Sequence, residues 1–457
     1  MSAVARLLMA HGDVSGSDQG RWPLSEALRK QGVTVHDTFE ASHVAGADVV
    51  VRSSAYKEDN PEVAVAIARG ITLWKRHDAW RFLAKGKRVV AVAGTHGKTT
   101  TTAMTWTALH HSNIDASLIC GAPLAETGTN AHVGKSDVLV IEADEYDRVF
   151  HALAPAVAIV TNIDHDHVDL FPTREEYLDA FRTFVAGIRR GGTLLACADD
   201  PGSLSLLGEA RTSLAGRTLH SYGTEARADW RATANEVVRV DSDGRAIDPG
   251  DVHHAFGPRF EVEGPHGVTG HVDLNVPGMH NVRNATAAFA AASVIGADTE
   301  RIRYGLMQFA GTSRRLEELG QAGRITVVDD YAHHPVEIRA SIAAMRPLAK
   351  RVIVLFQPHT AGRLDAFFEE FVSALRAADA AVVAETFASA RRDTDARGAS
   401  RELATRAGAQ YARDAEEGAG LLADLAQPGD VVLILGAGDV RPAGERLLEL
   451  LRARTPA

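Results

Sequence analysis

The chain has 457 residues, which suggests roughly three domains, and its 45% hydrophobic and 24% charged residues are the proportions of an ordinary globular protein. A net charge of −10 argues against binding to DNA or an anionic membrane through overall charge, although a nucleotide substrate needs only a local cationic pocket. Two cysteines, Cys120 and Cys197, are too few for a disulfide framework, so we predict a reducing, cytoplasmic compartment. The sequence has no apolar run close to the ~20 residues of a membrane-spanning helix, and residues 1–13 lack the pattern of a signal peptide.

Short apolar runs recur along the chain after a first α/β region that ends near residue 86. Each run stops at a polar or glycine-rich loop, and helical patterns such as 175–189 and 365–378 lie between the runs. Alternating strands and helices predict parallel sheets covered by helices, with ligands at the carboxyl ends of the strands. The predicted strands are 89–93, 138–141, 157–160, 325–328, 352–356 and 431–435.

We therefore predict an α/β protein of three domains. Residues 1–86 form an N-terminal Rossmann-like domain, 87–312 a central domain like that of P-loop ATPases, with a parallel sheet, and 313–457 a C-terminal Rossmann-like domain. Within the central domain, residues 224–276 are rich in Asp, Gly and His and contain short alternating stretches such as 259–262. They predict a β-rich subdomain or flap.

Residues 94–100, GTHGKTT, follow the predicted strand at 89–93 and precede a predicted helix. Glycines let backbone N–H groups approach phosphate oxygens, a lysine supplies positive charge, and a hydroxyl can ligate Mg²⁺. The loop is shorter than the usual GxxxxGK[ST] pattern, and the alternative is a strand-to-helix turn that merely contains GKT. The predicted phosphate-binding residues are Gly94, Thr95, His96, Gly97, Lys98, Thr99 and Thr100, with Lys98 exposed at the strand end.

Two acidic segments follow the next predicted strands, EADEYD at 142–147 and NIDHDHVD at 162–169. Carboxylates and hydroxyls suit Mg²⁺, which neutralises phosphate charge in ATP chemistry. Their position beside the phosphate loop favours Glu142 and His167 as metal ligands, since a neutral histidine can bind a metal. Three other acids are equally well explained as solvated loop charges: Asp144, Asp147 and Asp164.

These segments, in this order, resemble the Mur ligases, a family that joins amino acids to a UDP-muramoyl precursor of peptidoglycan. The resemblance covers nearly the whole chain. Segments 329–335 and 356–363 are similar to the family member that adds L-alanine to UDP-N-acetylmuramate. The further segments that carry the resemblance are PGMHNVRNA at 277–285, GTSRRLE at 311–317, DDYAHHP at 329–335 and FQPHTAGR at 356–363.

The resemblance implies an ATP-dependent ligase that joins L-alanine to UDP-N-acetylmuramate through an acyl phosphate. It implies ATP as co-substrate, Mg²⁺ as metal and small-molecule substrates as the partners, with no nucleic acid and no membrane insertion. Closure of the central and C-terminal domains over ATP would exclude the water that hydrolyses an acyl phosphate.

The same resemblance assigns roles to individual residues. Lys98 contacts the β- and γ-phosphates, either Arg314 or Arg315 reaches phosphate from the next domain, and Arg363 binds the amino-acid carboxylate through its guanidinium. The implied catalytic residues are Lys98, His167, Arg314 and Arg315, and the implied Mg²⁺ ligands are Thr99, Glu142 and His167. Beyond the phosphate loop, the implied ATP contacts are Asn162, His280, Asn281, Asn284 and Asp330; the amino-acid site is Tyr331, His333, His359 and Arg363; and the UDP-substrate site is Ser17, Asp18, Ser53, Ser54 and Asn130.

Members of the family open with a strand and a glycine-rich loop, GxGGxGMS, that cradles the UDP diphosphate, whereas residues 1–8 here align with the helix after that loop. We therefore expect the first domain to lack this strand and loop. A start codon assigned too far downstream is favoured over a real truncation, because the uridine-side segments 15–18 and 53–56 are intact. As written, the chain is expected to bind the UDP-sugar weakly, with a first domain prone to local unfolding.

Three alternative functions stay open. A ligase that attaches a recycled tripeptide to UDP-N-acetylmuramate is compatible with 142–147, although 356–360 favours the alanine-adding enzyme. A P-loop kinase or ATPase would join no amine, and a third α/β domain with Arg363 argues against it. Intact Lys98 and Glu142 argue against a non-catalytic nucleotide sensor. The sequence does not determine oligomeric state, selectivity for alanine over serine or glycine, or lysine carbamylation.

Overall fold

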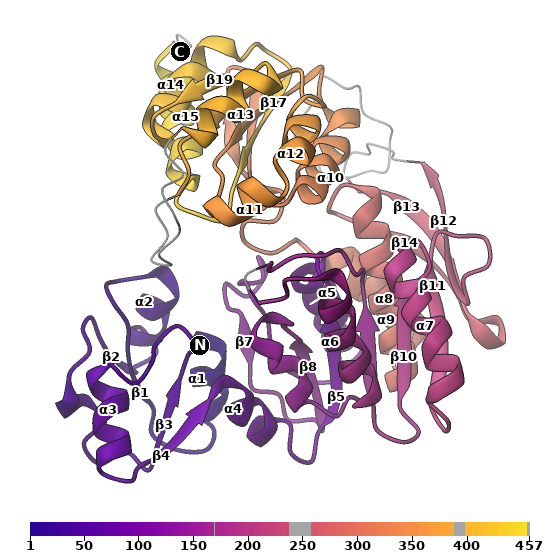
Figure 1. Ribbon diagram of the computed structural model, residues 1–457. Coiled ribbons are helices and arrows are strands. Elements are labelled where there is room, and N and C mark those ends of the chain that lie inside the picture. Colours follow the sequence, from indigo (N-terminus) through magenta and orange to yellow (C-terminus); the bar gives the residue numbers. More distant parts are fainter. Residues whose placement is uncertain (169, 237–256, 388–397, 455–457) are drawn as a thin grey trace.

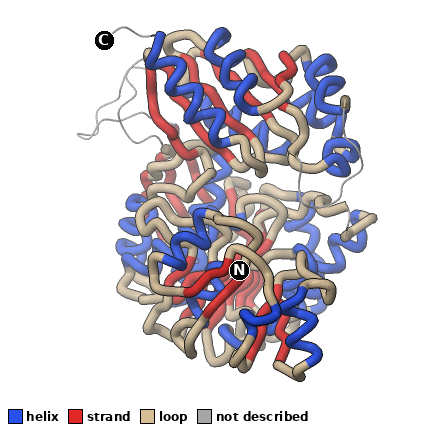
Figure 2. Tube along the Cα trace, turned by 90° about the vertical axis from the view of Figure 1, so that its left-hand side faces the viewer, coloured by secondary structure: helices blue, strands red, loops and turns tan. Residues whose placement is uncertain are grey.

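The computed structural model describes residues 1–168, 170–236, 257–387 and 398–454, which fold into three α/β regions (Figure 1). The N-terminal region lies beside the central region, and the C-terminal region lies above the central region in Figures 1 and 2. The alternation of strands and helices predicted from the sequence is confirmed in all three. None of the described helices is long and apolar enough to cross a membrane.

The N-terminal region contains two separate parallel strand pairs instead of one continuous sheet. One pair is β1 (Ser15–Ser17) with β2 (Thr34–His36), and the other is β3 (Val49–Arg52) with β4 (Thr72–Lys75). The prediction of a Rossmann-like sheet is therefore confirmed only as strand pairs with helices between them. The helices of this region are α1 (Ser2–Leu8), α2 (Pro23–Arg29), η1 (Ala41–Val44), α3 (Pro61–Ala68) and α4 (Arg76–Leu83).

A ten-stranded sheet in the order β14-β13-β12-β11-β10-β9-β5-β8-β6-β7 forms the central region. Its middle strand, β5, is parallel to β8 on one side and β9 on the other, so the three predicted strands are confirmed as neighbours. These strands are buried on both faces, which explains their continuous apolar runs. The parallel core consists of β5 (Arg88–Ala93), β6 (Ser117–Ile119), β8 (Val138–Glu142), β9 (Val157–Val160), β10 (Thr193–Cys197) and β11 (Thr218–Gly223), and the short β7 (Ala131–His132) pairs antiparallel with β6.

The predicted β-rich stretch at 224–276, with its strand at 259–262, is confirmed, but its described strands do not form a separate subdomain or flap. Its described strands, β12 (Trp230–Glu236), β13 (Arg259–Glu263) and β14 (Thr269–Asp273), extend the central sheet. Because β13 and β14 pair antiparallel, the sheet is mixed and not purely parallel. Residues 237–256 of the predicted flap lie outside the described residues.

Two layers of helices cover the central sheet (Figure 1). Helices α5 (Lys98–His111), α8 (Met279–Ile295) and α9 (Thr299–Gln308) pack together in one apolar core. The second core includes η2 (Tyr146–Ala152), α6 (Arg174–Ala186) and α7 (Pro201–Ser213), together with α1 and α4 of the N-terminal region. The predicted helix at 175–189 is confirmed, with its end three residues earlier.

A six-stranded sheet in the order β15-β16-β20-β17-β18-β19 forms the C-terminal region. The predicted helix at 365–378 is wrong as a single helix, because Phe367 has non-helical angles (φ −123°, ψ 30°) and separates α11 (Ala361–Ala366) from α12 (Phe368–Leu375). The strands are β15 (Glu317–Ala322), β16 (Ile325–Asp330), β17 (Arg351–Phe356), β18 (Ala380–Ala384), β19 (Gln410–Ala412) and β20 (Asp430–Leu435). The other helices of this region are α10 (Pro335–Met345), α13 (Ala399–Ala407), α14 (Ala415–Leu425) and α15 (Arg441–Arg454), and the short η3 (Pro265–Gly267) and η4 (Arg346–Leu348) complete the described chain.

Candidate functional site

The loop between β5 and α5 has the strand–loop–helix geometry predicted for residues 94–100. Gly94 has φ +138°, and a Cβ there would lie 2.0 Å from Thr161 Oγ1. Gly97 has φ +80°, and a Cβ there would lie 2.8 Å from Asn284 Oδ1. Both positions therefore require glycine.

Asn162, which the sequence assigned to ATP, holds this loop in place. Its Oδ1 accepts a hydrogen bond from His96 N at 2.8 Å, and its Nδ2 donates to His96 O at 2.9 Å. Thr95 Oγ1 donates to Asp164 O at 2.8 Å, so a second residue of the same segment supports the loop. The loop is thus fixed by the segment after β9 before any ligand binds.

Lys98 is not exposed, which corrects the prediction. Its side chain is only 13% exposed, and its ammonium forms an ion pair of 2.9 Å with Glu145, whose side chain is 1% exposed. Nζ also donates to Gly94 O at 2.6 Å and Thr95 O at 2.9 Å. Burial alone would lower the pKa of Lys98, but the nearby acids, Glu145 foremost, raise it above its ordinary value.

Thr99 and Glu142, two of the predicted Mg²⁺ ligands, lie together. Thr99 Oγ1 donates to Glu142 Oε1 at 2.9 Å, and Gly121 N donates to Glu142 Oε2 at 2.6 Å. Burial raises the pKa of Glu142. A half-buried carboxylate beside a hydroxyl is a donor set of the kind that Mg²⁺ prefers, so these residues fit that ion.

His167, the third predicted ligand, faces a different carboxylate. Its Nε2 lies 3.4 Å from Glu145 Oε1 and 3.9 Å from Asp166 Oδ2. Glu145 is therefore shared between His167 and Lys98. Glu145 and Asp166 were not predicted from the sequence, because their contacts with Lys98, His167 and Arg363 follow only from the tertiary structure.

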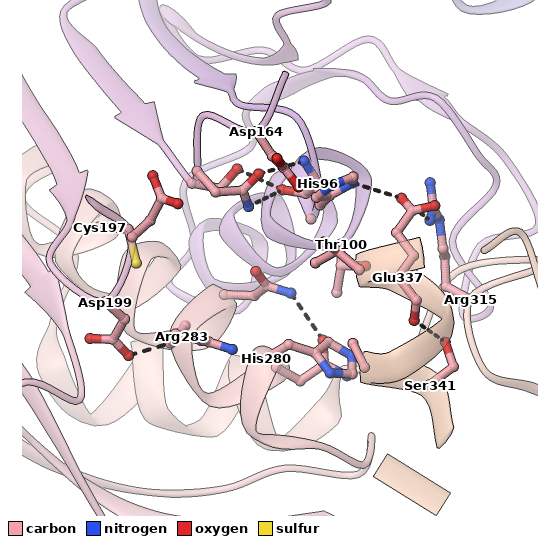
Figure 3. Close-up of a pocket in the computed structure, with 18 of the residues that line it drawn as sticks. His96, Thr100, Asp164, Cys197, Asp199, His280, Arg283, Arg315, Glu337 and Ser341 are labelled. Atoms are coloured by element: carbon pink, nitrogen blue, oxygen red, sulfur yellow. Dashed lines mark hydrogen bonds and ion pairs between the residues drawn. The ribbon is translucent and has the colours of Figure 1, made fainter. Parts of the chain in front are cut away.

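A cavity of about 480 Å³ lies between the phosphate loop, α8 and the C-terminal region (Figure 3). In Figure 3, Arg315 and Glu337 lie on one side of it, and Cys197 and Asp199 lie on the other. The sequence did not single out Asp199, Asp200 or Arg283, which also line the cavity. The predicted ATP-binding residues that line it are His96, Gly97, Thr100, Asn162, His280, Asn281, Asn284 and Asp330.

Burial sets the charges of the cavity walls. Burial and the guanidinium groups of Arg283 and Arg315 lower the pKa of His280 to about 4. Burial raises the pKa of Asp330 to about 6, and Ser341 Oγ donates to Asp330 Oδ2 at 2.5 Å. The cavity lining therefore carries a neutral imidazole and an acid that is readily protonated.

The two predicted arginines have different surroundings. Arg315 lines the cavity, and its Nη1 lies 3.9 Å from Glu337 Oε1. Arg314 instead donates to Gly436 O at 2.6 Å and lies 3.3 Å from buried Asp329. Of the alternatives left open by the sequence, the structure thus brings Arg315 to the cavity.

The four residues predicted for the amino-acid site gather at the carboxyl ends of β16 and β17. The ring centroids of Tyr331 and His333 are 5.2 Å apart, and those of His333 and His359 are 6.0 Å apart. The rings of His359 and Phe387 stack with centroids 5.8 Å apart. Arg363 pairs with Asp166 of the central region at 2.8 Å, so this group faces the acidic segment.

The residues predicted for the UDP-substrate site lie in two different places. Ser17 Oγ donates to Glu62 Oε1 at 2.6 Å, and Tyr56 OH donates to Asp18 Oδ1 at 3.3 Å, which links the segments after β1 and β3. Ser53 and Ser54 follow β3 in the same region. Asn130 is instead buried, and its Oδ1 accepts from Arg6 Nη1 at 2.8 Å.

Comparison with known proteins gives matches along the whole chain. Residues 1–88 match the Mur ligase family catalytic domain, 92–292 the Mur ligase middle domain, and 314–438 the Mur ligase glutamate ligase domain. The UDP-N-acetylmuramate–L-alanine ligase of Chloroflexus aggregans is 41% identical, covering 100% of this chain and 97% of that protein. The enzyme of the same name from Thermobifida fusca is 40% identical over 99% of this chain and 94% of that protein.

Two solved structures are similar over the full length. The UDP-N-acetylmuramate-alanine ligase of Thermotoga maritima matches with a TM-score of 0.79 at 25% identity, covering 100% of this chain and 97% of that one. A murein peptide ligase from Psychrobacter arcticus matches with a TM-score of 0.71 at 25% identity, with the same coverage of 100% and 97%.

Proposed function

The chain belongs to the Mur ligase family, and we propose that it is an ATP-dependent ligase that joins L-alanine to UDP-N-acetylmuramate in the synthesis of peptidoglycan precursors. The observation that carries this proposal is the meeting of two half-sites across the central and C-terminal regions. The phosphate loop and the Thr99–Glu142 pair lie on one side, and the Tyr331–His333 group lies on the other. The names of relatives about 40% identical over their full length support the choice of L-alanine.

The proposed reaction has two steps. The substrate carboxylate attacks the γ-phosphorus of ATP, ADP leaves, and the carboxylate becomes an acyl phosphate. The amine of L-alanine then attacks the acyl carbon, loses a proton, and expels inorganic phosphate as the amide forms. In such reactions the protein contributes mainly positioning and stabilisation of charge on the transferred phosphoryl group.

On the nucleotide side, Lys98 would contact the β- and γ-phosphates after giving up part of its contact with Glu145. When bound, Mg²⁺ supplies positive charge that neutralises the phosphates, and Thr99, Glu142 and His167 would hold it. The half-buried His280 with Asn281 and Asn284 would bind the adenosine in the cavity. Arg315 reaches the same cavity and would contact phosphate, while Asp330 would support the nucleotide.

On the amino-acid side, Arg363 would bind the carboxylate of L-alanine. Its guanidinium already holds the carboxylate of Asp166 through Nε and Nη2, so the geometry for a carboxylate is in place. Tyr331, His333 and His359 would enclose the small side chain. Burial lowers the pKa of His333 to about 3, so its imidazole adds no positive charge there.

We assign residues 1–86 to the UDP substrate, 87–312 to ATP and 313–457 to the amino acid. The residues proposed to contact the UDP-sugar are Ser17, Asp18, Ser53, Ser54 and Asn130. Since the co-substrates are ATP and a UDP-sugar, we place the reaction in the cytoplasm.

Mass spectrometry of the product tests the proposal. The protein is incubated with ATP, Mg²⁺ and UDP-N-acetylmuramate, with L-alanine and the tripeptide L-Ala-γ-D-Glu-meso-diaminopimelate in equal amounts. We expect the L-alanine adduct and one ADP per adduct. Tripeptide adduct in excess would identify the recycling ligase, and ADP release without any adduct would identify a kinase or ATPase; either result would overturn the proposal.

A further inference from the structure

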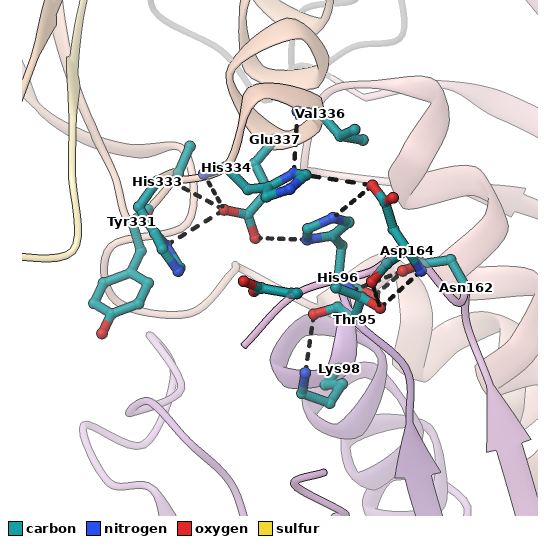
Figure 4. A network of polar contacts seen from close by, with 12 residues as sticks. Thr95, His96, Lys98, Asn162, Asp164, Tyr331, His333, His334, Val336 and Glu337 are labelled. Atoms are coloured by element: carbon teal, nitrogen blue, oxygen red, sulfur yellow. Dashed lines mark hydrogen bonds and ion pairs between the residues drawn. The ribbon is translucent and has the colours of Figure 1, made fainter. Parts of the chain in front are cut away.

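A compact group of two histidines and one aspartate joins the central and C-terminal regions outside the Thr99–Glu142 pair. His96 lies in the phosphate loop, Asp164 in the segment after β9, and His334 at the start of α10 (Figure 4). One ligand atom from each of these three side chains lies within 4.8 Å of the others. His96 Nε2 is 3.5 Å from Asp164 Oδ2, and His334 Nδ1, which also accepts a hydrogen bond from Val336 N at 3.4 Å, is 3.9 Å from the same oxygen.

The distance between His96 and Asp164 fits two ligands of one ion. Ligand atoms about 2.0–2.1 Å from a tetrahedral zinc ion stand roughly 3.4 Å apart, close to the 3.5 Å between His96 Nε2 and Asp164 Oδ2. His96 Nε2 is buried and has no hydrogen-bond partner in the described structure. The group that this nitrogen faces is the Asp164 carboxylate at 3.5 Å, a separation that an ion bound by both atoms would also give.

The other nitrogen of His96 is oriented as in metal sites. His96 Nδ1 lies 3.1 Å from Glu337 Oε1, and Figure 4 shows the His96 ring between Glu337 and Asp164. A histidine that ligates a metal nearly always donates its second N–H to a carboxylate or carbonyl, which fixes the tautomer. Glu337 is itself fixed, because its Oε2 accepts hydrogen bonds from His333 N at 3.0 Å and His334 N at 3.2 Å.

From this geometry we infer that His96, Asp164 and His334 form a second metal site, specific for a borderline divalent cation such as Zn²⁺ or Co²⁺, that bridges the central and C-terminal regions. Two imidazoles and one carboxylate favour such ions, whereas Mg²⁺ prefers oxygen ligands. Three protein ligands leave a fourth position for water. The inferred site shares His96 with the phosphate loop and borders the nucleotide cavity, so it rests beside the proposed function, but its ligands are distinct from Thr99, Glu142 and His167.

A proton on His96 competes with the metal ion for the inferred site. Burial alone would lower the pKa of His96, yet the carboxylates of Asp164 and Glu337 raise it to about 9. An imidazolium would therefore hold the two carboxylates in the absence of metal, and the cation must displace its proton. The test consequently has to measure binding of the ion itself.

Titration of the nucleotide-free protein with Co²⁺, in the presence of excess Mg²⁺ to occupy oxygen sites, provides that measurement. We expect visible d–d absorption of the intensity typical of four-coordinate Co²⁺, which saturates at one ion per chain and disappears on addition of Zn²⁺. Affinity for Zn²⁺ is then measured by competition with a chromophoric chelator. Loss of a residue that hydrogen-bonds a metal ligand typically costs about 10–100-fold in metal affinity, and loss of a ligand itself should cost at least as much.

Two variants remove ligands with little expected damage to the fold. His334→Asn removes the imidazole but keeps a residue that caps a helix well, and Asp164→Asn removes the carboxylate charge. We expect each to lose the Co²⁺ spectrum and at least 10-fold in Zn²⁺ affinity, with an unchanged circular dichroism spectrum. His132→Ala is the matched control, because His132 forms a comparable pair with Asp115 at 2.6 Å elsewhere on the central region. Absence of the wild-type spectrum, or wild-type binding by His334→Asn, would overturn the inference.

Discussion

Arg363 and Asp166 form a buried ion pair that joins α11 of the C-terminal region to the segment after β9 of the central region. Arg363 Nη2 lies 2.8 Å from Asp166 Oδ1 and 3.0 Å from Oδ2, and Nε lies 3.1 Å from Oδ1. Burial alone would raise the pKa of Asp166, but Arg363 holds it well below its ordinary range. A guanidinium that the sequence assigned to the substrate carboxylate thus already binds a carboxylate of the protein.

Replacement of Arg363 tests whether it also binds the amino acid. We expect Arg363→Ala to raise the KM for L-alanine by roughly 10–100-fold, the cost of a lost charge-assisted contact, and the KM for ATP far less. Steady-state kinetics with each substrate varied in turn measures both constants. Asp166→Asn is the companion variant, since it removes the pairing but keeps the guanidinium, and we expect a much smaller rise in the KM for L-alanine. Equal effects of Arg363→Ala on both substrates would instead assign Arg363 to the nucleotide site or the fold.

Replacement of Lys98 should stop ligation. A lost contact to the transferred phosphoryl group costs on the order of 3 kcal/mol or more in the barrier, so Lys98→Ala is expected to reduce kcat ~100-fold or more. The same variant leaves Glu145 as a buried, less compensated charge, so its thermal midpoint should fall as well. The double variant Lys98→Ala/Glu145→Gln separates the two effects, because it should recover most of the thermal midpoint without recovering kcat. Ligation by Lys98→Ala at a rate near that of the wild type would rule out the assigned role.

Local patterns were sufficient to predict the central strands of both large sheets and the phosphate loop. The runs at 89–93 and 157–160 are buried on both faces, and Gly94 and Gly97 stand where a Cβ would clash, so each signal has a local cause. The division of the first region into two strand pairs is not a local property, and short runs such as 15–17 carry no information on which strand they pair with.

Which side chains contact each other within the site could not be predicted either, because these contacts are not a local property of the sequence. Lys98 was expected to be exposed because a loop lysine usually is, but the fold places Glu145 against it. Glu337 occupies the third helical position of α10 after the N-cap His334, a capping pattern visible in HHPVE. That pattern could have identified Glu337 as fixed, yet its contact with His96 spans 241 residues and follows only from the tertiary structure.

His280 should make stability depend on pH on the acidic side. Its pKa is about 4 in the folded protein and about 6.5 in an unfolded chain, because burial and the charges of Arg283 and Arg315 disfavour the imidazolium. Between these values the unfolded chain binds more protons, so stability falls as the pH falls from about 6.5 towards 4, by about 1 kcal/mol per pH unit at most. Denaturant midpoints of the wild type and of His280→Gln, compared across this range, measure the effect. We expect a shallower pH dependence in His280→Gln, and identical slopes would contradict the assignment.

Arg441 should stabilise the C-terminal region through a buried carboxylate. Its Nη1 lies 3.0 Å from Asp329, which is 0% exposed, and 2.7 Å from Glu317, and Arg314 lies 3.3 Å from the same aspartate. Removing one partner of a buried charge leaves that charge uncompensated. Because Arg441 is one-third exposed and Arg314 remains, we expect Arg441→Ala to destabilise by about 2 kcal/mol rather than the larger loss of a fully buried pair.

Thermal unfolding followed by calorimetry measures this loss, with Arg446→Ala as the matched control. Arg446 lies on the same helix, α15, and its contact with Glu416 joins side chains that are both largely exposed. Surface ion pairs contribute little, so Arg446→Ala should leave the midpoint of the C-terminal transition nearly unchanged, whereas Arg441→Ala should lower it by several degrees. If both variants shift the midpoint equally, the stabilisation comes from helix α15 as a whole and not from the pairing of Arg441 with Asp329.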